Sequence, residues 1–473
     1  MLEFLGIIQN TFASSVEVEA VTTLTTNGII SIIGLVALFA ILITEKIDKT
    51  IISMLIAGML IFLQVFTDGS GIGPTSQEVA GEFIYHNLDI FAFIIGMMII
   101  SGIAKDSGVF NYVALRIAKK VNGNPIKLFF ILSYMAFFMT VFISNIPTII
   151  ILAPIVVLIT KKLDIPTIPY IIGIITFANL GGAVTPISDP TTYFQATKLG
   201  FSFMDVVTNT GLIMSITTFS SSLYLYLVFK KDFKTKPDLE YLDKVNPIEY
   251  LEDKKELIVS LGILFIVILV VVGKEFIASK TGLRLDNGSI TLFGAFLAIL
   301  FLKHNVSNVL NSKVDYATLF FFAGLFIVVG ALEYNGIILL LADQLVEITK
   351  GNDGLLLLML TMGSAILSVF IDNVPYNIAM VSTLESFRLL PEFISENGTA
   401  TATWTALAWG LNSCTSIGGA GSPIGAACNV IAIGQAEKTG VIIKFGKFLM
   451  IGVPLVLINS GIAYGILYFR YLF

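Results

Sequence analysis

A short motif occurs twice in this chain, and each copy places polar side chains inside an apolar stretch. Residues 141–147 read VFISNIP and residues 369–375 read VFIDNVP, so Ser144-Asn145 and Asp372-Asn373 each lie just before a proline. Inside a lipid bilayer an unsatisfied backbone group costs several kcal/mol, so a broken helix persists mainly where it lines a cavity. The two motifs therefore predict a binding site for an ion or a small solute.

A second motif follows each copy of the first. Residues 181–188 read GGAVTPIS and residues 418–425 read GGAGSPIG. Two glycines followed by a proline unwind a helix and free carbonyl oxygens, which can bind a hard cation such as sodium. Polar side chains that can add ligands in and around these breaks are Thr185, Ser188, Thr191 and Thr192 in the first copy, and Thr415, Ser416, Ser422 and Asn429 in the second.

Each half of the chain contributes one carboxylate to these breaks. Asp189 precedes Pro190 as a helix N-cap would, but a carboxylate at membrane depth costs about 2.5–3.5 kcal/mol or more, so we expect a functional role. Asp372 follows the same argument, and the counterparts of the two acids are Ala426 and Ser144. With no lysine or arginine inside the breaks, two carboxylates favour a cation or protons. We expect sodium at Asn145, Asp189, Asp372 and Asn373.

The composition defines the class of protein. Of 473 residues, 56% are hydrophobic and only 13% are charged, whereas soluble domains carry about 25% charged residues. The chain is therefore expected to be an all-α polytopic membrane protein, with roughly ten to twelve membrane elements of ~20 residues each. It has no phosphate-binding glycine motif, which argues against an ATP-driven pump, and we do not expect an enzyme. The small net charge gives no indication of nucleic-acid binding, and the lipid bilayer is the expected surroundings.

The repeated motifs divide the chain into two homologous halves. We predict an N-terminal interfacial segment over 1–26, a first repeat over 27–229, a charged linker over 230–255 and a second repeat over 256–473. Each repeat should contain a re-entrant hairpin and a broken transmembrane helix.

The placement of basic residues predicts that the two repeats are inverted. Lys46, Lys49 and the lysines of the linker belong to one crowded side, which the positive-inside rule makes cytoplasmic. The stretch 128–160 has lysines of that side at both ends, and each of its arms is short for a span, so it should enter and leave from the cytoplasm. The stretch 354–388 should do the same from the opposite face. We expect a multi-pass protein of the cell membrane with a cytoplasmic linker.

The segments VFISNIPTIIILAP, NLGGAVTPISDPTT, VFIDNVPYNIAM and SIGGAGSPIGAACNVIAIG resemble the ion transporter superfamily. That superfamily includes D-type bacterial sodium/proton antiporters, the melanosomal P protein, arsenite efflux membrane subunits and divalent-anion/sodium symporters. The resemblance covers about residues 28–470. It maps functional positions of the antiporters onto Asp189, Thr191, Thr192, Asp372 and Asn373, with Ser368 one turn before. It also implies a homodimer, with a scaffold part and a moving transport part in each protomer.

One position departs from the antiporters. They carry Asp-Asn at the first tip, whereas this chain has Ser144-Asn145, as the divalent-anion symporters do. The leading hypothesis is a sodium/proton antiporter that works by alternating access, with sodium ions and protons as coupling ions and no other cofactor. The alternatives are a sodium- or proton-coupled transporter of a small anion such as a di- or tricarboxylate, held by helix N-termini, and arsenite efflux.

Overall fold

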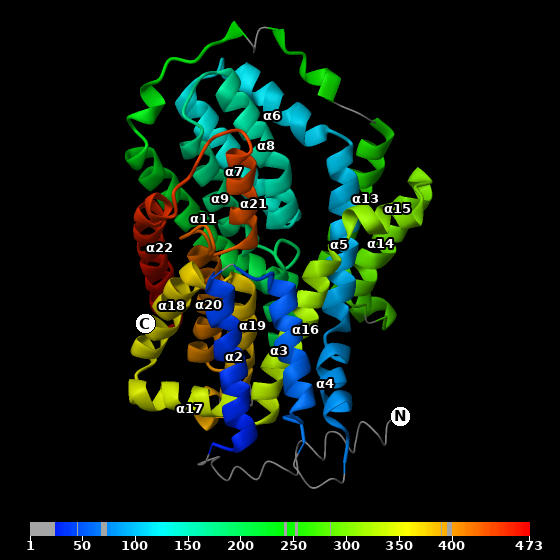
Figure 1. Ribbon diagram of the computed structural model, residues 1–473, viewed down its shortest axis with the longest axis vertical. Coiled ribbons are helices and arrows are strands. Elements are labelled where there is room, and N and C mark those ends of the chain that lie inside the picture. The colour runs from blue at the N-terminus through cyan, green and yellow to red at the C-terminus, as the bar shows by residue number, and fades with distance from the viewer. Residues whose placement is uncertain are drawn as a thin grey trace.

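The computed structural model describes residues 24–44, 46–67, 73–240, 244–250, 254–283, 285–388, 390–394 and 400–473. These residues form helices joined by short loops (Figure 1). Nine of the described helices are long and apolar enough to cross a membrane, and three shorter apolar helices accompany them. The all-α membrane fold is thus confirmed. The predicted interfacial segment 1–26 lies almost entirely outside the described residues.

The helices of the two halves follow the same order. The first half contains α2 (Thr26–Thr44), α3 (Lys49–Phe62), α5 (Leu88–Asp106), α7 (Pro125–Phe142), α8 (Asn145–Lys162), α9 (Ile168–Gly182), α10 (Pro190–Leu199) and α11 (Phe203–Val228). The second contains α13 (Lys254–Thr281), α14 (Asn287–Leu302), α16 (Tyr316–Tyr334), α18 (Asp353–Phe370), α19 (Asn373–Phe387), α20 (Ala402–Gly419), α21 (Ala427–Glu437) and α22 (Phe445–Leu467). In each half a helical hairpin is followed by a broken helix, as predicted.

Four helices were not predicted, because each of them, at 8 to 13 residues, is too short to cross a membrane. They are α4 (Ser76–Tyr85), α6 (Val109–Lys120), α15 (Val306–Lys313) and α17 (Ile337–Thr349). Short helices of this kind connect the longer ones. Between the halves, described parts of the linker lie over the ends of α8 and α6: the Asp238 amide donates to the Leu163 carbonyl at 2.9 Å, and Lys119 Nζ donates to the Val245 carbonyl at 3.0 Å.

The breaks form where the sequence requires them. At each hairpin tip one isoleucine is extended, Ile143 with φ −131° and Ile371 with φ −116°, and the next helix begins two residues later. Pro147 and Pro375 then lie in the first turn of α8 and α19, where an N–H has no helical partner and its absence costs least. The same reason allows Pro190 to begin α10.

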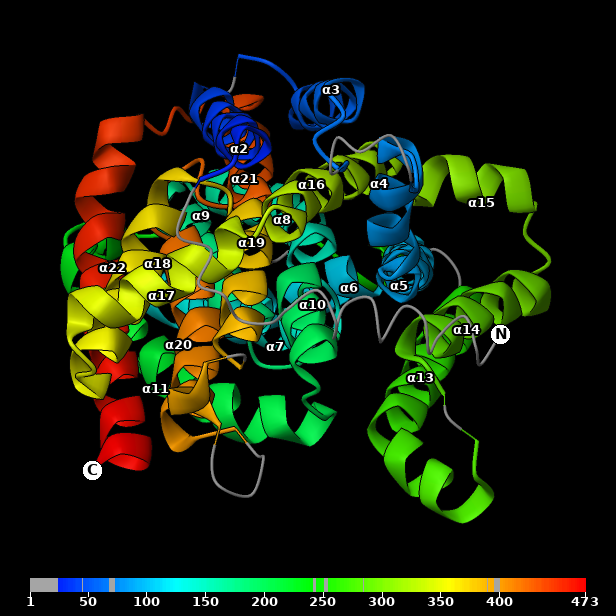
Figure 2. The same ribbon diagram turned by 90° about the horizontal axis from the view of Figure 1, so that it is seen from below.

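The two halves are interleaved in space. Helix α3 packs against α16 and α5 packs against α14, while α8 packs against α21 and α10 against α19. The hairpin α7–α8 lies in the upper half of Figure 1 and the hairpin α18–α19 in the lower half, with their tips toward the middle. Figure 2 shows α13, α14 and α15 on one side of the molecule and α11, α18, α20 and α22 on the other. Each hairpin therefore contacts the broken helix of the opposite half.

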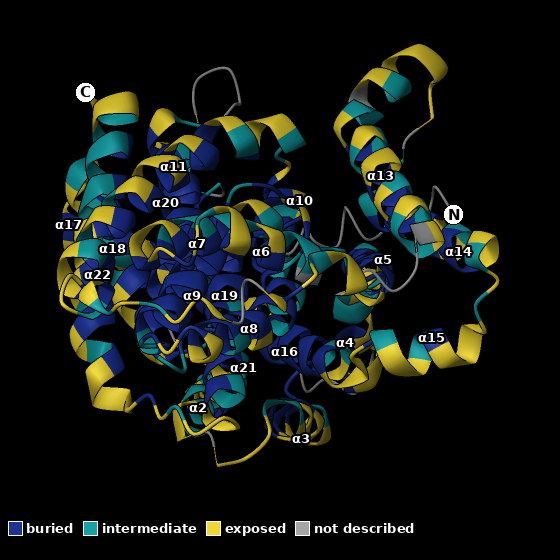
Figure 3. Ribbon diagram, turned by 90° about the horizontal axis from the view of Figure 1, so that it is seen from above, coloured by how far each residue is buried: buried dark blue, intermediate teal, exposed yellow. Residues whose placement is uncertain are grey.

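The core is centred on the long arms of the broken helices. All residues of α9 except Ile168 are buried, and so are all but two of the residues in α20. Figure 3 shows buried residues concentrated around α7, α8, α9, α19 and α20, whereas α13 and α15 expose much of their surface. The breaks thus lie next to the most densely packed part of the protein.

Candidate functional site

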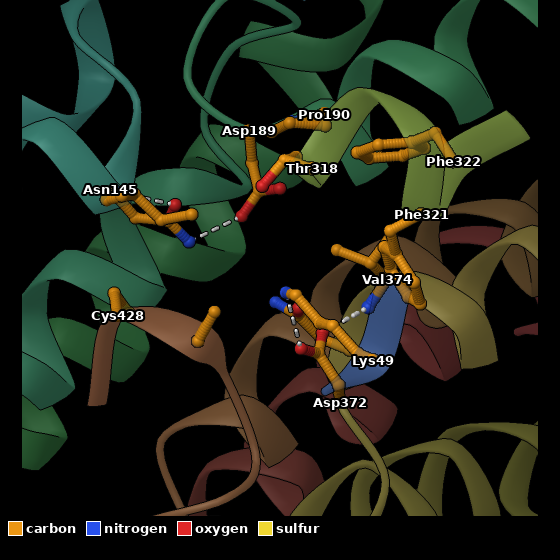
Figure 4. Close-up of a pocket in the computed structure, with 13 residues that line it drawn as sticks. Lys49, Asn145, Asp189, Pro190, Thr318, Phe321, Phe322, Asp372, Val374 and Cys428 are labelled. Carbon is orange, nitrogen blue, oxygen red and sulfur yellow. Dashed lines mark hydrogen bonds and ion pairs between the residues drawn. The ribbon is translucent and has the colours of Figure 1, made fainter. Parts of the chain in front are cut away.

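A pocket lies where the hairpin tips and the broken helices meet (Figure 4). Its empty volume is about 380 Å³, which includes space open to solvent. The N-terminal ends of α3, α8, α10, α19 and α21 all border it, and one face of α16 closes it. Its lining residues are Lys49, Asn145, Ile146, Asp189, Pro190, Thr318, Phe321, Phe322, Asp372, Asn373, Val374, Ala427 and Cys428.

Asp189 occupies the end of this pocket that belongs to the first half. It is only 2% exposed. Its Oδ1 accepts a hydrogen bond from the Thr191 amide at 3.1 Å, so it is the N-cap of α10. Its Oδ2 accepts from Asn145 Nδ2 at 2.8 Å, which joins the first hairpin tip to the first broken helix. The predicted proximity of Asn145 and Asp189 is therefore observed.

Asp372 lies across the pocket at the tip of the second hairpin (Figure 4). Its Oδ1 accepts from the Val374 amide at 3.1 Å, and its Oδ2 lies 3.5 Å from the ammonium nitrogen of Lys49. That ammonium also lies 4.9 Å from the centre of the Phe321 ring. Asp372 is thus paired with a cation, whereas Asp189 is bonded to neutral donors.

Lys49 is a pocket residue that sequence reasoning missed. The breaks themselves contain no basic residue, as noted from the sequence, but α3 brings this one into the same pocket. In the sequence Lys49 is a basic residue before an apolar run, which is the usual pattern of a cytoplasmic loop. Lys49 reaches the pocket only because α3 packs against α16, and no local sequence pattern predicts that contact.

Several predicted hydroxyls serve the backbone instead of the pocket. Thr185 Oγ1 donates to the Val141 carbonyl at 2.7 Å, and Ser422 Oγ donates to the Val369 carbonyl in the equivalent place of the second half. Ser188 Oγ donates to the Gly182 carbonyl at 2.6 Å, and Ser368 Oγ to the Thr415 carbonyl at 2.8 Å. Thr185, Ser422 and Ser368 thus tie each broken helix to its own hairpin, and Ser188 holds the first break in shape.

The carbonyl groups of the Gly-Gly pairs also have partners. Thr192 Oγ1 donates to the Gly182 carbonyl at 3.0 Å. Asn429 Nδ2 donates to the Gly419 carbonyl at 2.7 Å, and Asn429 Oδ1 accepts from Asn179 Nδ2 at 2.9 Å. Thr192 and Asn429 therefore hold the two unwound segments in matching ways, and Asn179 links the halves.

A few buried polar atoms near the breaks have no hydrogen-bond partner. They are Asn373 Nδ2, Thr191 Oγ1, Thr415 Oγ1 and Ser416 Oγ. Buried polar groups are normally satisfied, so an unpaired one often marks a place for a ligand or water. Of these residues, Asn373 lines the pocket itself.

The predicted site residues thus divide into two groups. Asn145, Asp189, Asp372 and Asn373 come together around one pocket, and Ser144 Oγ lies 3.4 Å from Asn145 Oδ1 beside it. The remaining predicted residues do not line the pocket: Thr185, Ser188, Thr191, Thr192, Ser368, Thr415, Ser416, Ser422 and Asn429.

Two helical hairpins and two broken helices around a shared pocket define a polytopic membrane transporter. A sequence model of the CitMHS family, described as "Citrate transporter", matches residues 39–412. Because this match covers most of the chain, the protein belongs to that family.

Known proteins agree with this assignment. The chain is 28% identical over 447 residues to the "46 kDa membrane protein" of Mycobacterium leprae, covering 94% of this chain and 99% of that protein. It is 25% identical over 499 residues to the human P protein, covering 90% of this chain and 58% of that protein. The expected place in the ion transporter superfamily is thereby confirmed.

Solved structures share the fold. The YdaH transporter of Alcanivorax borkumensis superposes with a TM-score of 0.54 at 13% identity, over 94% of this chain and 98% of that chain. MtrF of Neisseria gonorrhoeae superposes with a TM-score of 0.52 at 12% identity, over 95% and 96%. At these identities the likeness concerns the fold alone.

Proposed function

We propose that this protein is a secondary active transporter of the cell membrane that exchanges sodium ions for protons by alternating access. One observation carries the proposal: Asp189 from the first half and Asp372 from the second line the same pocket between the hairpin tips. A carboxylate that binds either a proton or a sodium ion can exchange one for the other. Protons and sodium ions are then the coupling ions.

The pocket offers oxygen ligands of the kind that hard cations prefer. The carboxylates of Asp189 and Asp372 and the side-chain oxygens of Asn145 and Asn373 supply them. In the present arrangement Asn145 turns its amide nitrogen toward Asp189. A sodium ion beside Asp189 therefore requires this amide to rotate so that its oxygen faces the ion.

The arrangement of the hairpins supports alternating access. We infer that α7–α8 and α18–α19 are re-entrant from opposite faces of the membrane, since the helix order repeats and the tips meet. Movement of the hairpins and broken helices against the remaining helices would expose the pocket to one side at a time. The homodimer implied by the resemblance provides a fixed scaffold for that movement.

A second candidate function is coupled transport of a di- or tricarboxylate. The family description and one feature of the pocket favour it: Lys49, the unpaired Asn373 Nδ2 and several helix N-termini are all suited to a carboxylate group. In this case Asp189 would bind the coupling sodium ion or proton.

The deciding experiment uses purified protein in proteoliposomes that contain a pH-sensitive dye and an imposed proton gradient. Sodium, lithium and potassium are added in turn. We expect sodium to dissipate the gradient, and Asp189→Asn and Asp372→Asn each to lower the rate by about 30-fold or more, because each removes a charged ion ligand. The matched control is Asp205→Asn, which alters an exposed carboxylate at the start of α11.

Other outcomes separate the alternatives. If no cation dissipates the gradient in vesicles that hold folded protein, sodium/proton exchange is excluded. Uptake of radiolabelled citrate driven by sodium or by protons would then establish the second candidate, and arsenite is tested in the same vesicles.

A further inference from the structure

Lys49 places a positive charge beside one of the two acids and not the other. Its Nζ lies 3.5 Å from Asp372 Oδ2. Among the described residues Asp189 forms no such ion pair, and Asn145 and Thr191 donate to it instead. A site built only for a small cation would not need this ammonium group, which occupies the coordination space that an incoming cation requires.

The Lys49 ammonium group has a second neighbour besides Asp372. The side chain is 29% exposed and rests on a flexible four-carbon stem. The ring of Phe321, with its centre 4.9 Å from Nζ, borders the same pocket. An aromatic face attracts an ammonium group, so the lysine can leave Asp372 without losing all stabilisation.

We propose that Lys49 is a tethered competitor for Asp372: its ammonium group holds this carboxylate while the pocket is empty and is displaced when a cation binds. This inference rests on the proposed function, because it takes Asp372 as a cation ligand. Two carboxylates and one ammonium group leave a single net negative charge, which matches one monovalent cation. Lys49 therefore lowers the affinity for that cation, which favours its release after transport.

The displacement also changes how two parts of the protein are connected. Lys49 begins α3, which packs against α16, whereas Asp372 lies at the tip of the second hairpin. While the ion pair is intact, it ties this tip to α3. When a cation binds to Asp372, the ion pair with Lys49 is broken. The hairpin then holds the cation and is no longer tied to α3.

The test measures binding, not transport, so it is independent of the exchange assay. Thermal unfolding of the purified protein in detergent is followed while sodium chloride replaces choline chloride at constant ionic strength. We expect Lys49→Met to lower the half-saturating sodium concentration by about tenfold, because a charged partner of Asp372 no longer competes. Lys49→Arg should stay near the wild type, since it retains the positive charge.

The control is Lys46→Met. Lys46 is exposed in the same turn before α3 and does not line the pocket, so its replacement removes the same charge without the contact. Its sodium titration should match that of the wild type. A shared change in both variants would indicate a general charge effect and overturn the proposal.

A chemical rescue covers the case in which Lys49→Met folds poorly. In Lys49→Cys the new thiol is modified with a reagent that adds an aminoethyl group, and in parallel with one that adds a neutral hydroxyethyl group. The native thiols Cys414 and Cys428 are 0% exposed, and the wild type treated with the same reagents controls for any reaction at Cys428, which borders the pocket. The aminoethyl group should restore the higher half-saturating concentration and the hydroxyethyl group should not.

The remaining outcomes are equally definite. An unchanged or raised half-saturating concentration in Lys49→Met overturns the proposal, as does the absence of any cation effect in both proteins. Sodium binding that follows the expected order, without proton exchange in vesicles, supports the Lys49 proposal and rejects the proposed function. Stabilisation of the wild type by citrate that Lys49→Met loses would make Lys49 a carboxylate ligand and overturn its role as a competitor.

Discussion

Asp189 and Ala426 occupy the same position in the two halves, yet only one of them is charged. They are the N-cap residues of α10 and α21, with φ −146° and ψ 137° for Asp189 and φ −153° and ψ 144° for Ala426. Asp189 caps its helix through the Thr191 amide, while Ala426 offers no side-chain cap. The hairpin tips show the opposite distribution, with Asp372 in the second half and Ser144 in the first. The two halves therefore share a backbone and differ in where each carries its acid.

Ser144→Asp should add a third carboxylate to the pocket. Ser144 and Asp372 are N-caps with similar φ angles, −44° and −46°, but Ser144 makes no capping hydrogen bond. The new carboxylate can accept from the Ile146 amide, which now donates to Asn145 Oδ1, and so free that oxygen for an ion. We expect sodium affinity to rise by about tenfold, because a nearby carboxylate contributes roughly 1 kcal/mol or more.

The measurement for Ser144→Asp is the sodium dependence of exchange and the charge moved per turnover on a supported membrane. Ser202→Asp adds the same charge at the N-cap of α11, away from the pocket, and should leave both quantities unchanged. A sodium dependence identical to that of the wild type would show that Ser144 does not face the ion.

Much of the architecture could be predicted because the bilayer makes its signals strong. The apolar runs, the prolines after Asn145 and Asn373, and the Gly-Gly pairs located both hairpins and both broken helices to within a few residues. The two acids and two asparagines of the pocket could be predicted for the same reason, since polar residues inside apolar runs are costly and therefore conspicuous.

The rest of the site depends on contacts between distant segments. Lys49 approaches Asp372 only after α3 has packed on α16, so its charge looked like that of an ordinary loop. Thr185 and Ser422 looked like ion ligands, but each donates to a carbonyl of its own hairpin. A hydroxyl beside a break can satisfy either an ion or the backbone, and the local sequence does not distinguish these roles.

Alanine at Gly181 or Gly418 should destabilise the protein. A Cβ at Gly181 would lie 2.6 Å from the Phe137 carbonyl oxygen, and a Cβ at Gly418 would lie 2.4 Å from the Ala365 carbonyl oxygen. These equivalent contacts let the long arm of each broken helix approach its hairpin closely. Since backbone atoms cannot move aside cheaply, we expect each substitution to cost about 1–3 kcal/mol.

Thermal unfolding in detergent measures this loss. The matched control is Gly262→Ala in α13, where a Cβ meets nothing within 4 Å, so the higher helix propensity of alanine should leave stability equal or slightly higher. Equal melting temperatures for all three variants would show that the helices separate easily at these glycines.

The backbone amides at the start of α4 should become less protected against hydrogen exchange in acid. Thr75 and Glu78 form a capping box, in which the Thr75 amide donates to Glu78 Oε2 at 2.7 Å. This backbone hydrogen bond, with one from the Thr75 hydroxyl, holds the pKa of Glu78 below its ordinary value of 4.5. Because the pKa is lowered on folding, the contribution to stability is full above pH 4.5 and is lost as the pH falls through the folded-state pKa.

Hydrogen exchange of the first turn of α4 tests this, with Glu78→Gln compared with the wild type at each pH. The wild type should be better protected near neutral pH, and the difference should vanish in acid. Glu82→Gln in the same helix lies outside the capping box and should match the wild type throughout. A difference that persists unchanged in acid would contradict the assigned role of Glu78.

Tyr193→Phe should change how fast the transporter turns over without changing how tightly it binds its ion. The Tyr193 hydroxyl donates to Asp89 Oδ2, and Asp89 Oδ1 accepts from the Gly288 amide at 2.8 Å, so this carboxylate links α10 to α5 and α14. The ring stacks on Phe93 at 3.8 Å, a contact that phenylalanine retains.

If α10 moves with the pocket while α5 and α14 stay fixed, this bond must break in each cycle. A hydrogen bond to a carboxylate contributes about 1.5–3 kcal/mol, so its removal should raise the maximal rate by about tenfold or more and leave the half-saturating sodium concentration unchanged. Tyr224→Phe is the matched control, because it removes a hydroxyl that bonds the Ile451 carbonyl between α11 and α22. An unchanged maximal rate with weaker sodium binding would show instead that Tyr193 supports the pocket and that α10 does not move against α5.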